Sequence, residues 1–510
     1  MRGGCVYLIG AGPGDPKLLT LRGLECIREA EVIVYDRLIN RRLLSYARAD
    51  AELIYAGKSP EGHYLTQDAI NEILAERARA GKKVARLKGG DPFIFGRGGE
   101  EAEYLAGSGL DFEIVPGVTS AVAAPAYAGI PLTHRDFTAT VAIVTGNEDP
   151  HKPDSNIDWG KLATGAGTLV FLMGMANLPD IVGKLVEHGR SPDTPAAVIH
   201  WGTWPEQVTV EGSLGNIVQK VKAAGVKNPS VVVVGEVCKL RPVLSWVEKR
   251  PLFGKRVLVT RAREQASALS EALGELGAEP YEFPTIAIAP PADWGPLDRA
   301  IAQAGTFDWI IFTSVNGVKY FFRRLRDLGR DIRELHGVRL AAIGPQTRGV
   351  LEGFGLRAAF VPEAFRAEEI ARGLKELIKK DERILLPRTD IAPKALNDAL
   401  TEAGARVTEV TAYRTLAVDE NTGEVRRLLE EGRVHAVTLT SSSTAKNLVR
   451  LLGGDAPTLL SGVAVASIGP VTSATARELG LRVDVEASEH TIPGLVRELE
   501  KYFVGSRGSA

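Results

Sequence analysis

Cysteine is scarce in this chain of 510 residues, which contains only Cys5, Cys26 and Cys238. None of the three stands in a CxxC pair, so they predict neither a disulfide framework nor a tetrahedral zinc site. We expect them to be small buried side chains in a reducing, cytoplasmic environment, and we expect no metal site.

An excess of charge of one sign is also missing. The 62 Lys and Arg residues balance 63 Asp and Glu residues, which gives a formal net charge of −1. Such a chain has no net positive charge that would attract nucleic acid or an anionic membrane, so a polyanionic ligand must bind at a local basic site. No stretch approaches about 18 uninterrupted apolar residues, so the sequence predicts neither export nor a membrane span.

Short β-branched runs alternate with amphipathic helical stretches along the whole chain. At roughly 100 to 200 residues per domain, the length predicts three or four folding units. The apolar runs are typical of strands buried on both faces, which indicates the α/β class with mostly parallel sheets covered by helices. The predicted strands include residues 6–9, 32–35, 83–87, 141–144, 168–173 and 231–234.

The charged, proline-containing segment at residues 248–253 is the best candidate for a linker. It separates a first half, residues 1–247, from a second half, residues 254–505, and residues 506–510 form a flexible tail. A polar turn near residue 136 divides the first half into subdomains of residues 1–136 and 137–247.

The second half contains an internal repeat with an offset of 125 to 127 residues. IFTS at residues 311–314 recurs as TLTS at 438–441, and IGP with a following Thr at 343–347 recurs at 468–472. A repeat of this length predicts two similar α/β lobes with a ligand cleft between them rather than a solenoid.

The first strand leads into GAGPGDP at residues 10–16 and then into a helical pattern. Read as a dinucleotide fingerprint, the segment has the first two glycines, and Asp36 at the end of the second strand could bind a ribose. The third glycine is replaced by Asp15, and Pro13 removes an amide donor. An NAD(P) site or a purely structural turn remain alternatives, whereas a phosphate loop is disfavoured because GK followed by Ser or Thr is missing.

The segment RLKGGDPFIFGRGGEE at residues 86–101 follows a strand and precedes a helix. Ligands of α/β proteins bind at such strand ends, and its five glycines would let the backbone approach a ligand. Two further loops follow, PGVTSA at residues 116–121 and AGIPLTHRD at residues 128–136.

Taken together, GAGPGDP, VIVYDRL, RLKGGDPFIFGRGGEE, PGVTSA and AGIPLTHRD resemble uroporphyrinogen-III C-methyltransferase, over about residues 4–247. The resemblance implies a two-subdomain α/β enzyme, usually a homodimer, that uses S-adenosyl-L-methionine to methylate two carbons of uroporphyrinogen III and yields precorrin-2. The cofactor contacts that it implies are Pro13, Gly89, Gly90, Asp91, Ile94, Thr119, Ser120, Met173 and Gly202.

The same resemblance implies roles in the reaction. The position of the general base is matched by Asp36, and Lys58 is a possible proton donor. The macrocycle carries eight carboxylates, so Arg97 and Arg135 are expected to bind them, with Glu100 holding Arg97 or the macrocycle nitrogens. One departure is Trp204, where relatives usually carry a small residue beside the adenine side of the site.

The second half resembles uroporphyrinogen-III synthase over about residues 254–503, through FTSVNG at 312–317, the two Gly-Pro-x-Thr segments and VTAYRT at 410–415. Members are two-lobed, with the chain crossing between the lobes twice, and they cyclise hydroxymethylbilane with inversion of the last ring and without a cofactor. Loss of water requires a proton donor, for which Tyr413 is the candidate. The expected substrate contacts are Arg261, Thr313, Ser314, Arg388, Thr440 and Ser441, although each hydroxyl could instead cap a helix.

The two resemblances predict a bifunctional enzyme that makes uroporphyrinogen III and then methylates it. Two alternatives remain: an NAD-dependent oxidoreductase, and a methyltransferase fused to a non-catalytic two-lobed domain that binds a tetrapyrrole. The sequence does not show whether the product goes to sirohaem, cobalamin or haem d1.

Overall fold

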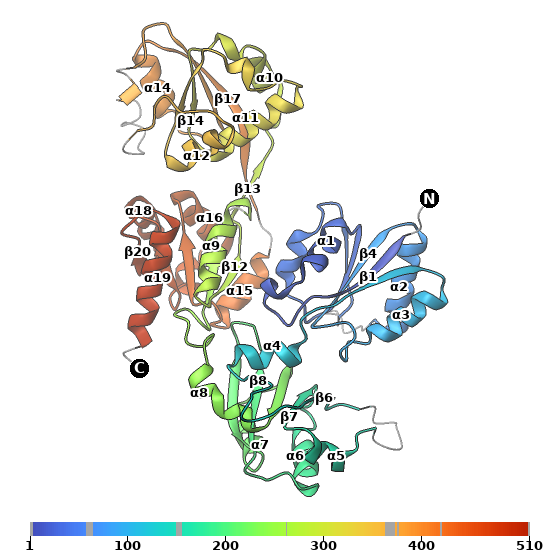
Figure 1. The fold of residues 1–510 in the computed structure, drawn as a ribbon. Coiled ribbons are helices and arrows are strands. Elements are labelled where there is room, and N and C mark those ends of the chain that lie inside the picture. Colours follow the sequence, from blue (N-terminus) through green and yellow to red (C-terminus); the bar gives the residue numbers. More distant parts are fainter. Residues whose placement is uncertain are drawn as a thin grey trace. The chain divides into compact units, whose positions relative to one another are not determined.

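A computed structural model describes residues 4–57, 65–148, 156–261, 263–362, 373–374, 377–418 and 421–507. The chain divides into two compact units. The first comprises Met1–Arg256, Leu273–Glu279 and Glu500–Ala510, and the second comprises Val257–Ala272 and Pro280–Leu499. The described residues form four five-stranded sheets with helices around them (Figure 1). The predicted domain boundaries and the linker at residues 248–253 stay predictions.

The first sheet is entirely parallel, with strand order β3-β2-β4-β1-β5. Its strands are β1 (Cys5–Gly10), β2 (Val32–Tyr35), β3 (Glu52–Tyr55), β4 (Lys83–Lys88) and β5 (Asp111–Val115), and its helices are α1 (Leu21–Glu29), α2 (Gln67–Arg79) and α3 (Gly98–Gly107). Helix α1 begins after Thr20, whose hydroxyl accepts a hydrogen bond from the Gly23 amide. Because the strands are parallel, their carboxyl ends meet at one edge of the sheet.

The second sheet, with order β6-β7-β10-β8-β9, is the exception to the predicted parallel arrangement. Strand β10 runs antiparallel to both β7 and β8, β8 runs antiparallel to β9, and only β6 and β7 are parallel. Its strands are β6 (Val141–Thr145), β7 (Thr168–Leu172), β8 (Pro195–His200), β9 (Val208–Ser213) and β10 (Ser230–Val234), with helices α5 (Trp159–Gly165), α6 (Leu178–Glu187), α7 (Ile217–Ala223) and α8 (Arg241–Leu244). Burial on both faces makes a strand apolar whatever the direction of its neighbours.

Helix α4 (Ser120–Tyr127) packs on the second sheet, although its residues precede the predicted subdomain boundary. Its buried alanines, Ala121 and Ala124, share a hydrophobic cluster with Val170 of β7 and Ala197 of β8. The small side chains let the helix approach the sheet closely. The loop before α4 therefore connects the two sheets of the first half.

Each sheet of the second half contains strands from both copies of the sequence repeat. One has the order β12-β11-β18-β19-β20 and the other β13-β17-β16-β14-β15. Strands β11 and β12, from the first copy, join β18 to β20 from the second copy, whereas β14 and β15 from the first copy join β16 and β17 from the second. A sheet is therefore not one copy of the repeat, and the chain passes from one sheet to the other twice, between β12 and β13 and after β17.

The elements of these two sheets have the following bounds. The first has β11 (Arg256–Val259), β12 (Glu279–Glu282), β18 (Ala436–Leu439), β19 (Ala464–Ser467) and β20 (Val485–Glu486), with α9 (Arg263–Glu275), α15 (Thr422–Glu430), α16 (Ser442–Leu452), α17 (Ala456–Leu459), α18 (Pro470–Glu478) and α19 (Ile492–Arg507). The second has β13 (Ile286–Ala289), β14 (Trp309–Phe312), β15 (Arg339–Ala342), β16 (Arg383–Thr389) and β17 (Arg406–Ala417), with α10 (Gly295–Ala302), α11 (Val315–Asp327), α12 (Pro345–Gly353) and α14 (Ala395–Glu402).

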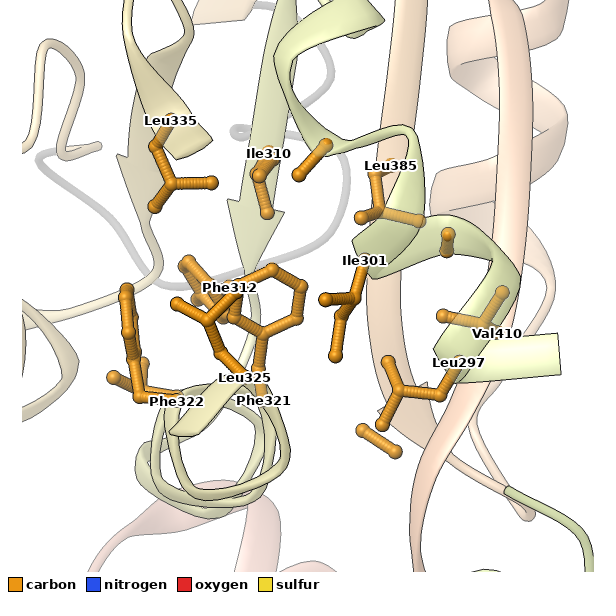
Figure 2. Close-up of a cluster of buried hydrophobic side chains, with 14 of the residues drawn as sticks. Leu297, Ile301, Ile310, Phe312, Phe321, Phe322, Leu325, Leu335, Leu385 and Val410 are labelled. Carbon is orange, nitrogen blue, oxygen red and sulfur yellow. The ribbon is translucent and has the colours of Figure 1, made fainter. Parts of the chain in front are cut away.

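A cluster of aromatic and aliphatic side chains forms the core between β14 and α11 (Figure 2). Phe312 of the strand lies 5.6 Å from Phe321 of the helix, measured between ring centroids. Phe322 stacks on Phe354 at 4.6 Å. Burying each such side chain contributes roughly 1.5–3 kcal/mol, so this core holds β14, and the loop that follows it, in place.

In the part of the chain that the structure describes, no helix is both long and apolar enough to cross a membrane.

Candidate functional site

Three glycine-containing loops meet at the carboxyl edge of the first sheet. The Ala11 amide donates to the Lys88 carbonyl at 2.8 Å, and Gly12 and Gly90 exchange backbone hydrogen bonds of 3.2 and 2.8 Å. A Cβ on Gly10 would lie 2.5 Å from the Gly117 Cα, and one on Gly117 would lie 2.3 Å from the Gly90 carbonyl oxygen. Only glycine permits this approach, which leaves a cradle of backbone groups.

Asp91, a predicted cofactor contact, ties two of these loops together. Its Oδ1 accepts a hydrogen bond from the Phe93 amide at 2.8 Å, and its Oδ2 accepts one from the Gly117 amide at 3.0 Å. Each carboxylate oxygen can accept a further bond, so the side chain can hold the loops and still meet a ligand.

Four more predicted cofactor residues lie on these loops or beside them. Thr119 caps α4, its hydroxyl accepting from the Ala121 amide at 3.3 Å, and Ser120 is the first residue of that helix. Pro13 and Gly89 lie on the loops after β1 and β4. The structure thus brings Pro13, Gly89, Gly90, Asp91, Thr119 and Ser120 to one sheet edge.

Gly202 and Met173 approach from the loops of the second sheet. A Cβ on Gly202 would lie 2.3 Å from the Cβ of Ala124, so this loop lies directly against α4. Ile94 and Met173 are 39% and 44% exposed, which leaves apolar surface for a ligand.

Unusual backbone conformations gather in the same segments. Positive φ angles occur at Phe95 (51°), Arg97 (57°), Met173 (58°), Trp201 (46°) and Thr203 (73°). Non-glycine residues adopt this region at a cost, and such residues concentrate at functional sites. The position of these residues supports the prediction that the segments containing them form the functional site.

Trp204, the departure noted in the sequence, connects the loop after β8 with the loop after β1. Its indole Nε1 donates to the Pro13 carbonyl at 3.1 Å. Beside it the Asp15 amide donates to Thr203 Oγ1 at 3.2 Å, and the Tyr127 hydroxyl donates to Asp15 Oδ2 at 2.8 Å. The large side chain therefore holds the first glycine loop in place.

A cavity of about 330 Å³ opens beside these loops. It combines predicted residues, namely Arg97, Glu100 and Met173, with neighbours that the sequence did not identify. The full lining is Phe95, Arg97, Glu100, Thr145, Asn147, Glu148, Asn156 and Met173. Charged, amide and apolar groups thus surround one space.

The two arginines that were predicted to bind substrate carboxylates differ in their surroundings. Arg97 forms a bidentate pair with Glu100, with Nε–Oε1 at 3.0 Å and Nη2–Oε2 at 2.6 Å. This hydrogen bonding raises the pKa of Arg97 and lowers the pKa of Glu100. Arg135 is exposed on the loop before β6.

Asp36, the predicted base, follows β2 and forms an ion pair with buried Arg86, with Oδ1–Nη2 at 2.7 Å. Arg86 also reaches Glu101, which binds Lys88, and the sequence analysis missed all three residues. The signal was available, because Arg86 and Lys88 are cations two residues apart whose neighbours in the strand, Val84, Ala85 and Leu87, are apolar. Lys58, the predicted proton donor, lies outside the described residues.

In the second half, Tyr413 lies on β17 with its hydroxyl 3.0 Å from Ser314 Oγ. Tyr413 is 6% exposed and belongs to the hydrophobic core between β14 and α11. Burial raises the pKa of Tyr413, so the phenol stays protonated at neutral pH. Ser314 also caps α11, accepting a hydrogen bond from the Gly317 amide at 3.0 Å.

Arg388 places a buried cation at the end of β16. Its side chain is 7% exposed and lies 3.6 Å from Glu409, between Nη1 and Oε1. Its Nε and Nη1 have no hydrogen-bond partner among the described residues. An under-satisfied guanidinium of this kind is suited to a carboxylate ligand.

The remaining predicted contacts lie at the ends of strands. Burial lowers the pKa of Arg261, which follows β11. Thr313 follows β14, Thr440 follows β18, and Ser441 forms a capping box with Thr444 at the start of α16. Ser314 and Ser441 therefore act as N-caps of α11 and α16. Contact of these two side chains with substrate stays a prediction.

Comparison with known proteins gives two family matches. Residues 5–218 match the model of the tetrapyrrole (corrin/porphyrin) methylases, and residues 267–497 match that of uroporphyrinogen-III synthase HemD. The porphyrin biosynthesis protein HemD of Ruminiclostridium josui is 38% identical over 499 residues, 98% of each chain.

Two further similarities concern the first half. The S-adenosyl-L-methionine-dependent uroporphyrinogen III methyltransferase of Methanosarcina barkeri is 51% identical over 241 residues, 47% of this chain and 94% of that protein. The crystal structure of uroporphyrin-III C-methyl transferase from Thermus thermophilus complexed with S-adenyl homocysteine is 38% identical and covers 46% of this chain and 99% of that one, with a TM-score of 0.40.

Proposed function

Because this chain belongs to the family of porphyrin biosynthesis proteins that join a tetrapyrrole methylase to a uroporphyrinogen-III synthase, we propose that it carries out two consecutive reactions. The second half cyclises hydroxymethylbilane to uroporphyrinogen III with inversion of ring D. The first half then methylates that product twice with S-adenosyl-L-methionine and yields precorrin-2.

The observation that carries the methyl transfer is the meeting of three glycine loops beside a cavity lined by Arg97 and Met173. A Cβ on Gly10 or Gly117 would collide with the backbone of the neighbouring loop, so these glycines let the loops approach closely and bring their backbone groups to the sheet edge, where a polar cofactor can bind. Bound S-adenosyl-L-methionine supplies an electrophilic methyl group. The protein's share is to position the macrocycle and to exclude water.

Each methylation at carbon would form one carbon–carbon bond, break the bond between sulfur and methyl carbon in the cofactor so that S-adenosylhomocysteine leaves, and leave the macrocycle with a proton to lose. Asp36, at the same sheet edge as the glycine loops, is the proposed acceptor of that proton. Arg97 and Arg135 are the proposed partners of the substrate carboxylates. When substrate binds, Arg97 can exchange its exposed pairing with Glu100 for a substrate carboxylate at little cost.

In the second half, Tyr413 is the proposed donor of the proton that converts the departing hydroxyl into water. Burial keeps the phenol protonated, and the Ser314 hydroxyl at 3.0 Å orients it. Arg388 is the proposed carboxylate contact, because its guanidinium is under-satisfied. No cofactor is needed, since ring closure depends on holding the bilane folded.

A second candidate function follows from the burial of Tyr413 in the core cluster. A tyrosine that only packs and hydrogen-bonds to Ser314 would leave the second half as a tetrapyrrole-binding domain without catalysis. The methyltransferase half would then act on uroporphyrinogen III from another source.

The deciding experiment is anaerobic incubation of the full chain with hydroxymethylbilane, with and without S-adenosyl-L-methionine, followed by mass analysis of the oxidised porphyrins. We expect a type III octacarboxylic product without cofactor, and a product heavier by two methyl groups with it. Tyr413→Phe should reduce the first step alone, and Asp36→Asn the second alone. Type I porphyrin alone would refute the synthase and support the binding domain.

We also propose that the chain assembles as a homodimer through its first half. Light scattering of the full chain should then give twice the 54.7 kDa of one chain. A mass equal to that of one chain would refute the dimer.

A further inference from the structure

Four charged side chains form a connected group beneath the glycine loops of the first sheet. Arg86 Nη2 lies 2.7 Å from Asp36 Oδ1, and Arg86 Nε lies 3.2 Å from Glu101 Oε1. Lys88 Nζ lies 2.7 Å from the same Glu101 oxygen. The side chains of Arg86, Lys88 and Glu101 are 2%, 4% and 0% exposed, whereas that of Asp36 is 31% exposed. The group thus reaches the surface at Asp36.

The fold explains why these side chains converge. Arg86 and Lys88 are two residues apart on β4, so both point to the same face of the sheet, where α3 brings Glu101. Gln67, at the start of α2, donates to Glu101 Oε1 at 3.1 Å. Glu101 Oε2 has no hydrogen-bond partner among the described residues. Glu101 therefore receives three donors on one oxygen and anchors both cations.

Burial of this kind is a poor source of stability. Removing ions from water carries a penalty that their mutual attraction only partly offsets, so an apolar cluster of the same volume would serve a core as well. The effect of burial is visible at Lys88, whose pKa is lowered first by burial and then by Arg86. What the group does achieve is a fixed geometry, because every partner is held by another.

The backbone of β4 links this group to the candidate site. The Asp36 amide donates to the Leu87 carbonyl at 3.3 Å, and the Ala11 amide donates to the Lys88 carbonyl at 2.8 Å. The strand that carries Arg86 and Lys88 thus also positions Asp36 and the first glycine loop. Among the described residues, the charged groups facing Asp36 are Arg86 and Lys88 of β4, with Glu101 of α3 behind them.

We propose that Arg86 is a positioning residue for the methyl-transfer reaction, which keeps Asp36 as an oriented carboxylate able to accept the substrate proton, and that Glu101 holds Arg86 in place. The inference rests on the proposed function of Asp36. The charge-assisted ion pair of 2.7 Å through Oδ1 fixes the direction of the Asp36 carboxyl group.

The test measures kcat and KM for methylation of uroporphyrinogen III between about pH 6 and pH 9 in the full chain. In Arg86→Gln, Asp36 loses the partner that fixes its direction, so kcat should fall about tenfold across this pH range. KM should change little, because Arg86 is buried away from the cavity. Arg77→Gln is the matched control, since it breaks an ion pair with Glu52 of β3 and should leave kcat unchanged.

Arg86→Lys keeps the charge but shortens the reach. We expect a kcat that is several-fold lower than that of the wild type and a KM that is little changed. Calorimetric binding of S-adenosylhomocysteine reports whether each variant retains a folded cofactor site. If Arg86→Gln does not fold, Arg86→Lys decides: an unchanged kcat, or a loss confined to KM, overturns the proposal.

The outcomes separate this proposal from the one on which it rests. A wild-type chain that does not methylate uroporphyrinogen III refutes the proposed function. An active wild type whose kcat is unchanged in folded Arg86→Gln refutes the positioning role alone. An equal fall of kcat in Arg77→Gln also refutes that role, because the effect would then be a general response to loss of a positive charge.

Discussion

At the scale of single residues, Gly14 and Trp204 have to be considered together. A Cβ on Gly14 would lie 2.0 Å from the indole Nε1 of Trp204, and Gly14 has a φ of 153°. The loop can therefore accept the large side chain only because Gly14 has none. Trp204 in turn occupies one lone pair of the Pro13 carbonyl, so a cofactor would meet Pro13 through its ring or its remaining lone pair.

The reactivity of each of the three thiols depends on its own surroundings. Burial raises the pKa of Cys26 to about 11 and that of Cys238 to about 12, and it raises the pKa of Cys5 as well. Since the thiolate is the reactive form, the native chain should react slowly with a thiol reagent at pH 8. Titration with such a reagent should show three fast-reacting thiols only after denaturation.

The pH dependence supplies the control for this prediction. As pH rises toward 10 the native thiols should react faster, with Cys5 first because it is the least buried of the three. A thiol that reacts at pH 8 as fast as a free cysteine would contradict the expectation and would indicate that the native chain opens at that site.

At the scale of elements, strands could be predicted more reliably than their directions. Residues 32–35 are β2 as expected, because a β-branched apolar run is typical of a buried strand. The antiparallel pairing of β10 with β7 and β8 was not predicted, since side chains buried on both faces are apolar in either direction. In the same way, the similarity of the two repeat copies does not show which strands of one copy pair with strands of the other in a sheet.

The candidate site could be predicted from the sequence at positions where the backbone conformation permits only glycine. Gly10, Gly90 and Gly117 stand where a side chain would collide or where the backbone reverses, and the sequence shows them directly. Arg86 and Lys88 are visible in the sequence as cations in a buried strand, but no local pattern reveals their partners, Asp36 after β2 and Glu101 of α3. Contacts between distant segments are the part that sequence alone does not supply.

Ser314 allows a prediction that separates a helix cap from a catalytic contact. Its hydroxyl caps α11 through the Gly317 amide and also meets the Tyr413 hydroxyl at 3.0 Å. Ser314→Ala should lower the free energy of unfolding by about 1 kcal/mol and also slow formation of uroporphyrinogen III. Urea denaturation and the initial rate of that reaction measure the two effects.

Thr491 offers the matched control, because it caps α19 by accepting a hydrogen bond from the Gly494 amide at 3.1 Å. Thr491→Ala should lose a similar free energy of unfolding without a change in the rate. If both variants slow the reaction equally, lost stability explains the effect, and the hydrogen bond to Tyr413 has no part in it.

At the scale of the whole molecule, the hydrophobic clusters follow the sheets. Phe171 belongs to the core of the second sheet, in the first unit, and Phe321 belongs to the core between β14 and α11, in the second unit. Separate cores predict separate unfolding transitions, and a ligand raises only the transition of the unit that binds it. S-adenosylhomocysteine at about 100 times its Kd should stabilise the first unit by about 2.7 kcal/mol, a rise in Tm of roughly 5–10 °C.

Calorimetry of the full chain measures these shifts, and two core variants identify the transitions. Phe171→Ala and Phe321→Ala should each cost about 3–5 kcal/mol and lower the Tm of one unit. The ligand should then raise the transition that Phe171→Ala lowers and leave the other unchanged. If it raises the transition that Phe321→Ala lowers, the cofactor site does not lie in the first unit. If both transitions rise together, the two units unfold as one, and each half of this enzyme depends on the other for its stability.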